Sequence, residues 1–369
     1  MNKIAIIGAG KTGRGFLARL AAESDCEVLL IDRDADLVRR LNEAGSFTVR
    51  FFGDSRPAMT VSGYRAVTWA DACLGGVDWI LVSVGGRNLP EVGQLLNEHL
   101  HGNLHRHIIT AENCSHPAQT LRDALTGQPV SVAESTVFCT TIEDGELNIA
   151  SEAYPYLQCD GAPLGGAVPP VAAIRPLDAF GNFLTRKLYT YNAASCVIAY
   201  LGFIKGYTDY GAAANDPDIL ALLDHNYAET NRVLCAEFGY APDDQAEFAL
   251  LSRRKFCDRT IADTVARNAR EPQRKLQNAE RVIGPMRLLA RYGADPSVLI
   301  LTAGAMLRYT DPSETEWNAL CASHTPVQLL EEIAGLAPDD PLTARILRAY
   351  DALGTSGADA VSISFLSNI

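Results

Sequence analysis

Short apolar runs recur along the first half of the chain, each ending in glycine or polar residues, as is typical of buried parallel strands. Stretches long enough to form helices separate these runs, so the pattern predicts a parallel sheet with crossover helices. In such a sheet, ligands bind beyond the carboxyl ends of the strands. The predicted strands are residues 3–7, 27–31, 79–84, 107–111 and 130–133.

The pattern changes in the second half, where apolar residues recur at helical spacing and strand-like runs almost vanish after residue 180. Between the halves, residues 161–176 are so rich in proline and glycine that no helix is expected, and we interpret them as a connection between domains. The predicted fold class is an α/β Rossmann-type N-terminal domain, residues 1–178, followed by a predominantly α-helical C-terminal domain, residues 179–369.

The first predicted strand runs directly into a G-x-G-x-x-G motif and the start of a helix. This order is the dinucleotide-binding fingerprint. Gly8 allows the tight turn, Gly10 lets the backbone approach a pyrophosphate, and Gly13 lets the helix pack on the strand. The N–H groups at the helix start would then face the phosphates. We therefore expect cofactor binding along the loop, at Gly8, Ala9, Gly10, Lys11, Thr12 and Gly13.

An acidic residue, Asp32, ends the second predicted strand, where an acid binds the ribose hydroxyls of NAD. Arg33 follows and could accept the 2′-phosphate of NADP, but Asp32 would repel that phosphate, so we expect NAD without excluding dual use. Val84 and Gly85 follow the third strand at the same sheet edge and complete the expected cofactor site. A glycine-rich loop in another kind of α/β domain is the alternative.

Composition and charge narrow the class of protein. The formal net charge is −12 over 369 residues, which argues against nucleic acid or an anionic membrane as the main partner. No apolar stretch is long enough to span a bilayer, and the first strand leaves no room for a signal peptide.

The nine cysteines form no C-x-x-C pair, which suits reduced thiols in a cytoplasmic protein. Histidines at 99, 101, 105 and 107 suggest a surface cluster, and we expect no metal site.

Three segments carry a resemblance to a known family. The first is RKLYTYNAAS, from Arg186 to Ser195; the others are Ala111–Asn113 and the RKL that begins at Arg274 and leads to Arg281. With the glycine loop, they make the chain similar to the polyol-specific long-chain dehydrogenases over nearly its whole length. The resemblance implies metal-independent hydride transfer between NAD and a sugar alcohol, catalysed by a monomer or small homo-oligomer.

The resemblance also implies roles for individual residues. The family's catalytic lysine falls on Lys187, and its two oxyanion-binding asparagines fall on Asn113 and Asn192. A hydroxyl that loses a hydride must also lose a proton, so a lysine of lowered pKa can serve as the base. Two amides at the same oxygen would stabilise the developing alkoxide. On an ideal α-helix Lys187 and Asn192 would lie about 140° apart and share at best a broad face.

The sequence also departs from the family pattern. The family histidine three residues after Asn192 is Ser195 here, which is shorter and cannot carry a positive charge. Either a water fills the gap, or the substrate or the activity has changed. A catalytically impaired NAD-binding homologue is therefore an alternative to an active enzyme.

A basic stretch indicates an anionic substrate. Residues 253–291 hold eleven lysines and arginines and four acids, in a chain that is negative elsewhere. A solvated helix face explains most of these charges, but Arg274, Lys275 and Arg281 match family positions and are the expected substrate-binding residues. The preferred small-molecule substrates are a hexitol phosphate and its ketose phosphate, and a uronate or aldonate sugar acid is the alternative.

Overall fold

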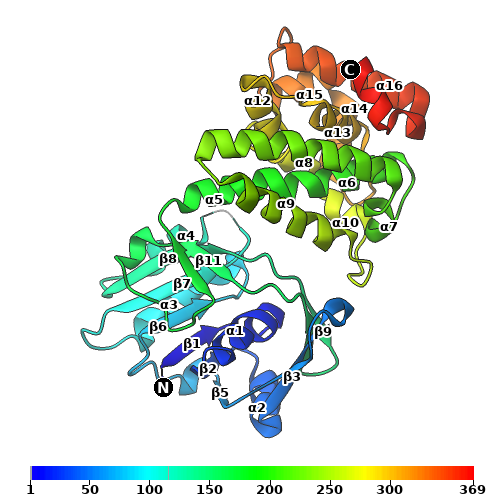
Figure 1. Ribbon diagram of the computed structural model, residues 1–369. Coiled ribbons are helices and arrows are strands. Elements are labelled where there is room, and N and C mark those ends of the chain that lie inside the picture. Colours follow the sequence, from blue (N-terminus) through cyan, green and yellow to red (C-terminus); the bar gives the residue numbers. More distant parts are fainter. Residues whose placement is uncertain (1, 115) are drawn as a thin grey trace. The chain divides into compact units, whose positions relative to one another are not determined.

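Two compact units make up the computed structural model, which describes residues 2–114 and 116–369. The N-terminal unit comprises Met1–Gly181 and the C-terminal unit Asn182–Ile369. Each unit has its own hydrophobic core, and each is described by itself (Figure 1).

The N-terminal unit is built on an eight-stranded sheet in the order β12-β11-β8-β7-β6-β1-β2-β5. Neighbours from β8 to β5 all run parallel, as the apolar runs predicted, whereas β11 pairs antiparallel with β8. The predicted Rossmann-type fold is confirmed. The strands are β1 (Lys3–Ile7), β2 (Glu27–Ile31), β5 (Tyr64–Val67), β6 (Trp79–Val82), β7 (Arg106–Ala111), β8 (Val130–Thr136), β11 (Leu157–Asp160) and β12 (Ile174–Leu177).

Helices cover both faces of this sheet because its central strands are apolar on both sides. In β1, Ile4 and Ile6 join a core with η1 (Gly13–Ala18), α1 (Arg19–Ala22) and α2 (Ala35–Ala44). The alternate residue Ile7 joins a second core with α3 (Leu89–His99) and α4 (Pro117–Ala124). Short 3₁₀ turns link the elements: η2 (Phe52–Asp54), η3 (Trp69–Asp71), η4 (Gly86–Asn88) and η5 (Ala162–Leu164).

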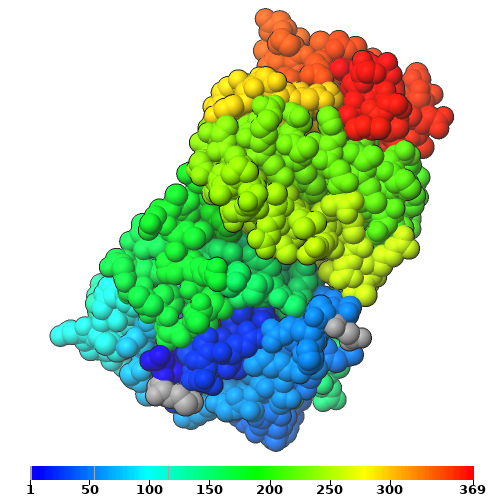
Figure 2. Space-filling model, viewed as in Figure 1, coloured from blue at the N-terminus to red at the C-terminus, as the bar shows by residue number. Residues whose placement is uncertain are grey.

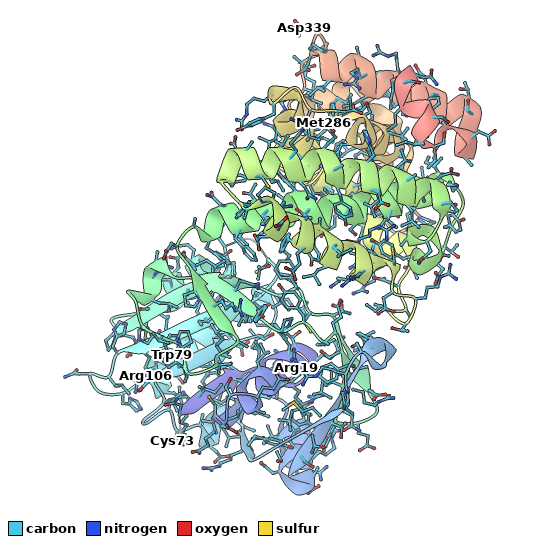
Figure 3. All side chains as sticks on the ribbon, viewed as in Figure 1. Arg19, Cys73, Trp79, Arg106, Met286 and Asp339 are labelled. Carbon is cyan, nitrogen blue, oxygen red and sulfur yellow. The ribbon has the colours of Figure 1, made fainter. Side chains whose placement is uncertain are left out.

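A second sheet in this unit was not predicted. Its order is β4-β3-β10-β9, formed by β3 (Ser46–Phe51), β4 (Met59–Ser62), β9 (Thr141–Asp144) and β10 (Asn148–Ser151). It packs against η1 where Gly15 has no side chain, since a Cβ there would lie 2.3 Å from Ile149 Cγ2. Arg19 is fully buried and reaches across to donate to the Tyr154 carbonyl at 2.6 Å (Figure 3).

The interpretation of residues 161–176 as a connection between domains is wrong. They lie within the N-terminal unit, where they form η5 and most of β12, the edge strand that pairs with β11. A proline has no N–H to donate, but an edge strand forms hydrogen bonds with only one neighbouring strand. Pro176 therefore does not prevent β12 from pairing with β11.

The C-terminal unit is helical, as predicted. Its centre is formed by α6 (Ala193–Ile204) and α13 (Ser297–Arg308), which are apolar on nearly every side and consequently buried. Met286 of α12 (Ile283–Arg291) lies in the same core (Figure 3). Figure 2 shows α16 (Pro341–Ser356) in red at one end of the visible face of this unit. No helix in the described ranges is both long and apolar enough to cross a bilayer.

The segments of this half, in chain order, are α5 (Phe180–Lys187), η6 (Leu188–Asn192), α6 (Ala193–Ile204), α7 (Tyr210–Ala214), α8 (Pro217–Phe238), α9 (Pro242–Cys257), α10 (Val265–Ala269), α11 (Pro272–Lys275), α12 (Ile283–Arg291), α13 (Ser297–Arg308), α14 (Thr315–Ser323), α15 (Pro326–Glu332), α16 (Pro341–Ser356), η7 (Gly357–Ala360) and η8 (Ile363–Asn368).

Candidate functional site

The glycine loop between β1 and η1 has the geometry that each glycine was expected to allow. Gly8 has a φ of 97°, which disfavours any residue with a side chain. A Cβ on Gly13 would lie 1.8 Å from the Gly8 carbonyl oxygen, so the helix packs against the turn only because that atom is missing. A Cβ on Gly10 would meet nothing within 4 Å, so the space beside this glycine is open.

Two side chains fix the loop. Asp32 accepts the main-chain N–H of Ala9 at 2.7 Å through one oxygen and that of Asp34 at 2.9 Å through the other. Arg14 is buried beneath the loop, where its guanidinium donates to the carbonyls of Ala9 and Leu147. Burial lowers the pKa of Arg14, and the charges of Glu143 and Asp32 partly offset this. Arg14 therefore braces the loop from inside.

A pocket lies at the carboxyl ends of β1, β2 and β6, where the fold rule placed it. Of the expected cofactor residues, Gly8, Gly10, Asp32, Arg33 and Val84 line it. The lining does not include the expected Ala9, Lys11, Thr12, Gly13 and Gly85, all of which the structure describes. Further lining residues that the sequence did not single out are Trp69, Asn88, Glu91, Val92 and Leu95.

Glu112 organises the end of β6. One of its oxygens accepts the main-chain N–H groups of Val84 at 2.7 Å and Gly85 at 2.8 Å, so these donors are already used. Burial raises the pKa of Glu112, and the two N–H groups oppose that rise. The next residue, Asn113, is held by the main chain of Val137, which receives a hydrogen bond from Nδ2 at 3.0 Å and donates one to Oδ1 at 3.1 Å. The Asn113 carboxamide is therefore fixed in orientation.

In the C-terminal unit, Lys187 is the last residue of α5 and is followed by η6, a π-helical turn. The Ala193 N–H donates to the Leu188 carbonyl five residues back, where an α-helix would use the fourth residue. The turn is therefore wider than an α-helical turn, and residues five apart lie closer to one face than they would in an α-helix. The separation of about 140° between Lys187 and Asn192 applies to an ideal α-helix, which this segment is not.

The charge state of Lys187 is set by its surroundings. Burial, and after it the positive charges of Lys255 and Arg281, lower the pKa of Lys187 to about 7. A substantial fraction of the amine is therefore unprotonated near neutral pH. Lysine with this pKa can take or give a proton at neutral pH, which an exposed lysine cannot do.

Further expected residues gather around this segment. Ser195 lies one turn beyond Asn192, and its hydroxyl is 3.4 Å from Asn268 Oδ1. Lys275 donates from Nζ to the Asn268 carbonyl at 2.6 Å, and burial is the main cause that lowers the pKa of Lys275 to about 8. Asn268 thus links the position of the missing family histidine to the buried lysine of α11.

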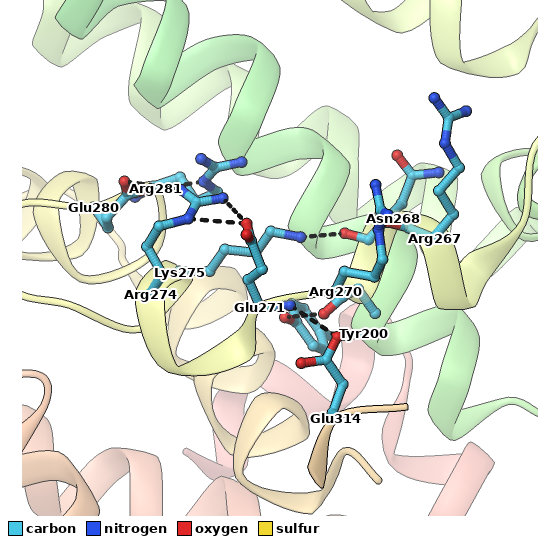
Figure 4. A network of polar contacts seen from close by, with 11 residues as sticks. Tyr200, Arg267, Asn268, Arg270, Glu271, Arg274, Lys275, Glu280, Arg281 and Glu314 are labelled. Atoms are coloured by element: carbon cyan, nitrogen blue, oxygen red, sulfur yellow. Dashed lines mark hydrogen bonds and ion pairs between the residues drawn. The ribbon is translucent and has the colours of Figure 1, made fainter. Parts of the chain in front are cut away.

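The expected anion-binding arginines are paired with carboxylates (Figure 4). Arg274 donates to Glu271 from Nε and Nη2, at 3.0 and 2.6 Å, and lies 3.3 Å from Glu280. Arg281 donates from Nε to Glu280 at 2.9 Å. An anionic ligand would therefore have to compete with Glu271 and Glu280 for these guanidinium groups.

Some of these residues could have been found from the sequence and others could not. Glu271 stands three residues before Arg274, a helical spacing that favours an ion pair, whereas the adjacent positions of Glu280 and Arg281 give no such signal. Glu112 was noticed only as part of a motif. Nothing in the sequence signals Asn268 or the π-helical turn, because both depend on packing within the C-terminal unit.

Comparison with protein families gives a match for each half of the chain. Residues 180–346 match the family model described as the mannitol dehydrogenase C-terminal domain. Residues 4–159 match the model described as ketopantoate reductase PanE/ApbA.

Curated relatives match almost the whole chain. A protein named mannitol-1-phosphate 5-dehydrogenase from Arthrobacter sp. (strain FB24) is 28% identical over 365 residues, which cover 92% of this chain and 95% of the relative. A protein of the same name from Brevibacillus brevis is 25% identical over 341 residues, or 86% of this chain and 88% of the relative.

Solved structures share the fold at low sequence identity. Mannitol 2-dehydrogenase of Pseudomonas fluorescens, solved with NAD and D-mannitol, has a TM-score of 0.70 at 15% identity and covers 100% of this chain and 95% of its own. A substrate-free D-sorbitol dehydrogenase has a TM-score of 0.78 at 12% identity, covering 97% and 94%.

Proposed function

We propose that this chain, whose residues 180–346 match the mannitol dehydrogenase C-terminal domain, is an oxidoreductase of that family. It would interconvert a sugar alcohol and the corresponding ketose by NAD-dependent hydride transfer, with Lys187 as the general base. The observation that carries this proposal is the lysine itself. Its pKa is lowered to about 7, and the π-helical turn that follows it supports a position of Asn192 closer to the same side than an α-helix would give.

The N-terminal unit supplies residues that fit a dinucleotide. The open space beside Gly10 and the N–H groups of the loop suit a pyrophosphate, and Asp32 at the end of β2 suits ribose hydroxyls. Bound NAD would supply the hydride acceptor. Asp32 disfavours the additional phosphate of NADP, which supports NAD as the preferred form.

In the C-terminal unit, the unprotonated amine of Lys187 takes the proton from the reacting hydroxyl as hydride leaves the same carbon. The amide N–H of Asn192 donates to the oxygen while negative charge develops on it. Asn113, whose carboxamide is held by Val137, is the second proposed amide donor. Ser195 lies beside Asn192, where its hydroxyl can bind a neighbouring substrate hydroxyl. In the reverse direction the Lys187 ammonium returns the proton.

We assign the substrate to the hexitol phosphates. Both relatives named above are mannitol-1-phosphate 5-dehydrogenases by name. Arg281 is close enough to Lys187 to lower its pKa, and Arg274 and Arg281 are in turn close enough to Lys275 to lower the pKa of that lysine. The ion pairs of Arg274 are solvent-exposed and worth little in free energy, so a phosphate dianion can displace them.

The experiment is a substrate panel. The protein is mixed with NADH and with ketohexose phosphates, uronates and free ketoses in turn, and the loss of NADH absorbance is followed. Oxidation with a ketose phosphate is expected, and the Lys187→Met variant should bind NADH normally but turn over at least about 10²-fold more slowly. Unchanged turnover in that variant would remove Lys187 from its role.

One observation favours a second candidate, a nucleotide-binding protein without catalysis. Ser195 stands where the family has a histidine. A serine hydroxyl can donate a hydrogen bond, but it cannot take up a proton and become positively charged as a histidine can. Tight NADH binding with no oxidation of NADH on any member of the panel would support this candidate. Oxidation with a uronate alone would instead indicate a sugar-acid oxidoreductase.

A further inference from the structure

A buried glutamine of α9 contacts both sides of the π-helical turn. Gln245 has no exposed surface, and its Oε1 accepts from Arg186 Nε at 2.7 Å. Its Nε2 donates to Thr190 Oγ1 at 3.2 Å and to Asn231 Oδ1 at 2.8 Å. Arg186 precedes the base, and Thr190 lies inside the turn. The glutamine thus bonds to the chain immediately before Lys187 and midway between Lys187 and Asn192.

The chemistry of Arg186 fixes the orientation of the glutamine amide. A guanidinium has only donors, so the amide oxygen must face it, and this directs both N–H groups toward Thr190 and Asn231. Arg186 is itself held: its guanidinium lies 4.4 Å from the Tyr240 ring and 4.2 Å from the Phe248 ring, and Nη2 is 2.7 Å from Asp244 Oδ2. All these groups come from the start of α9 or the residues just before it.

A π-helical turn needs such support because it is a rare alternative to the α-helix and occurs mostly as single turns at functional sites. Thr190 is fully buried, so its hydroxyl depends on protein partners. We propose that Gln245 is a positioning residue for catalysis: by tying Arg186 and Thr190 to α9, it maintains the turn that brings Lys187 and Asn192 closer to one side.

This inference rests on the proposed role of Lys187, but its geometry can be tested without turnover. Thr190→Val keeps the volume of the side chain and removes the hydroxyl that accepts from Gln245, and Thr190→Ser keeps the hydroxyl. Gln245→Met removes all three contacts at similar size. A matched control is Thr230→Val on α8, because Thr230 is equally buried and its hydroxyl has no hydrogen-bond partner among the described residues.

The first measurement is the pH dependence of Lys187 acetylation by acetic anhydride, followed by peptide mass spectrometry on the folded protein. We expect a midpoint near 7 in the parent, in Thr230→Val and in Thr190→Ser. In Thr190→Val and Gln245→Met the midpoint should move toward the ordinary lysine value of about 10.4, since the amine leaves its buried position.

The second measurement is turnover with the best substrate of the panel. Displacement of a catalytic group by about 1 Å can cost roughly 10²-fold in rate, so we expect kcat to fall by about that factor in Gln245→Met and by about tenfold in Thr190→Val. The KM for NADH should not change, because the cofactor residues lie in the other unit.

Each outcome decides a separate point. A parent-like labelling midpoint and kcat in both Thr190→Val and Gln245→Met would overturn the positioning role, and so would an equal effect of Thr230→Val, which would indicate general loosening. If Lys187→Met retained turnover, the proposed function would fail, whereas the labelling midpoints would still report whether Gln245 holds the turn.

Discussion

At the scale of single residues, the charged groups around Lys187 differ from those around Arg274 of the basic stretch, residues 253–291. Lys187 has the cations Lys255 and Arg281 nearby, so their effect adds to that of burial, and the pKa of Lys187 falls to about 7. Arg274, by contrast, has acidic neighbours, and Glu271 helps to raise its pKa. Lys187 is therefore a candidate base, whereas Arg274 of the basic stretch stays permanently charged.

The pKa of Lys187 predicts opposite pH profiles for the two directions. Alcohol oxidation needs the neutral amine, so kcat/KM should fall about tenfold per pH unit below 7 and level off above it. Ketose reduction needs the ammonium form, so it should level off below 7 and fall above. Steady-state rates between pH 5.5 and 9 would measure both. A profile that is flat in both directions would exclude Lys187 as the titrating base.

Asp32 predicts cofactor preference. The Asp32→Ser variant removes the charge that repels a 2′-phosphate and leaves Arg33 in the pocket to pair with it. We expect the preference for NAD over NADP, measured as the ratio of kcat/KM values, to fall by at least roughly tenfold, or about 1.4 kcal/mol.

The matched control for this variant is Asp34→Ser. Asp34 caps α2 by accepting the N–H groups of Asp36 and Leu37, and serine is an equally good cap, so the same charge is lost outside the pocket lining. If Asp34→Ser lost as much of the preference for NAD over NADP as Asp32→Ser does, Asp32 would act only through the net charge of the protein.

At the scale of elements, the glycine loop contains one glycine required by the protein and one required by the ligand. Gly13→Ala would place a Cβ 1.8 Å from the Gly8 carbonyl oxygen, so we expect a loss of about 1–3 kcal/mol in stability and a lower Tm. Gly10→Ala meets nothing within 4 Å, so Tm should stay unchanged while NADH affinity falls because the methyl group blocks the pyrophosphate. Calorimetry measures Tm, and a fluorescence titration measures the affinity for NADH. If Gly10→Ala bound NADH as tightly as the parent protein does, the pyrophosphate would have to bind elsewhere.

The elements that could be predicted are those whose signal is local. The observed β1 and β2 match the predicted strands residue for residue, since each is a buried run with a glycine or acid at its end. The second sheet was missed because β3, β4, β9 and β10 come from two distant parts of the chain, and β10 pairs with β3 across about a hundred residues. The π-helical turn has no sequence signal either, because Gln245 and Thr190 meet only in the folded unit.

At the scale of the whole molecule, charge was the least predictable property. Counting charges along residues 253–291 indicates a strongly cationic segment, but folding places Glu271 and Glu280 against its arginines. The local field that a substrate meets depends on this pairing and not on the count. Lys275 is buried and donates to the Asn268 carbonyl, and it adds positive charge close to Arg274 and Arg281.

Ionic strength therefore distinguishes a phosphorylated substrate from a neutral one. Salt shortens the Debye length from about 10 Å at 0.1 M to about 3 Å at 1 M, which weakens attraction between a dianion and the cations around Arg274. The KM of a ketose phosphate should rise several-fold over this range while that of a free ketose stays constant, and Arg274→Gln should flatten the rise. Arg39→Gln is the matched control, because Arg39 also pairs with an acid three residues earlier and with a second carboxylate. A salt-independent KM for the phosphate would refute the anion site and leave a neutral polyol as the substrate.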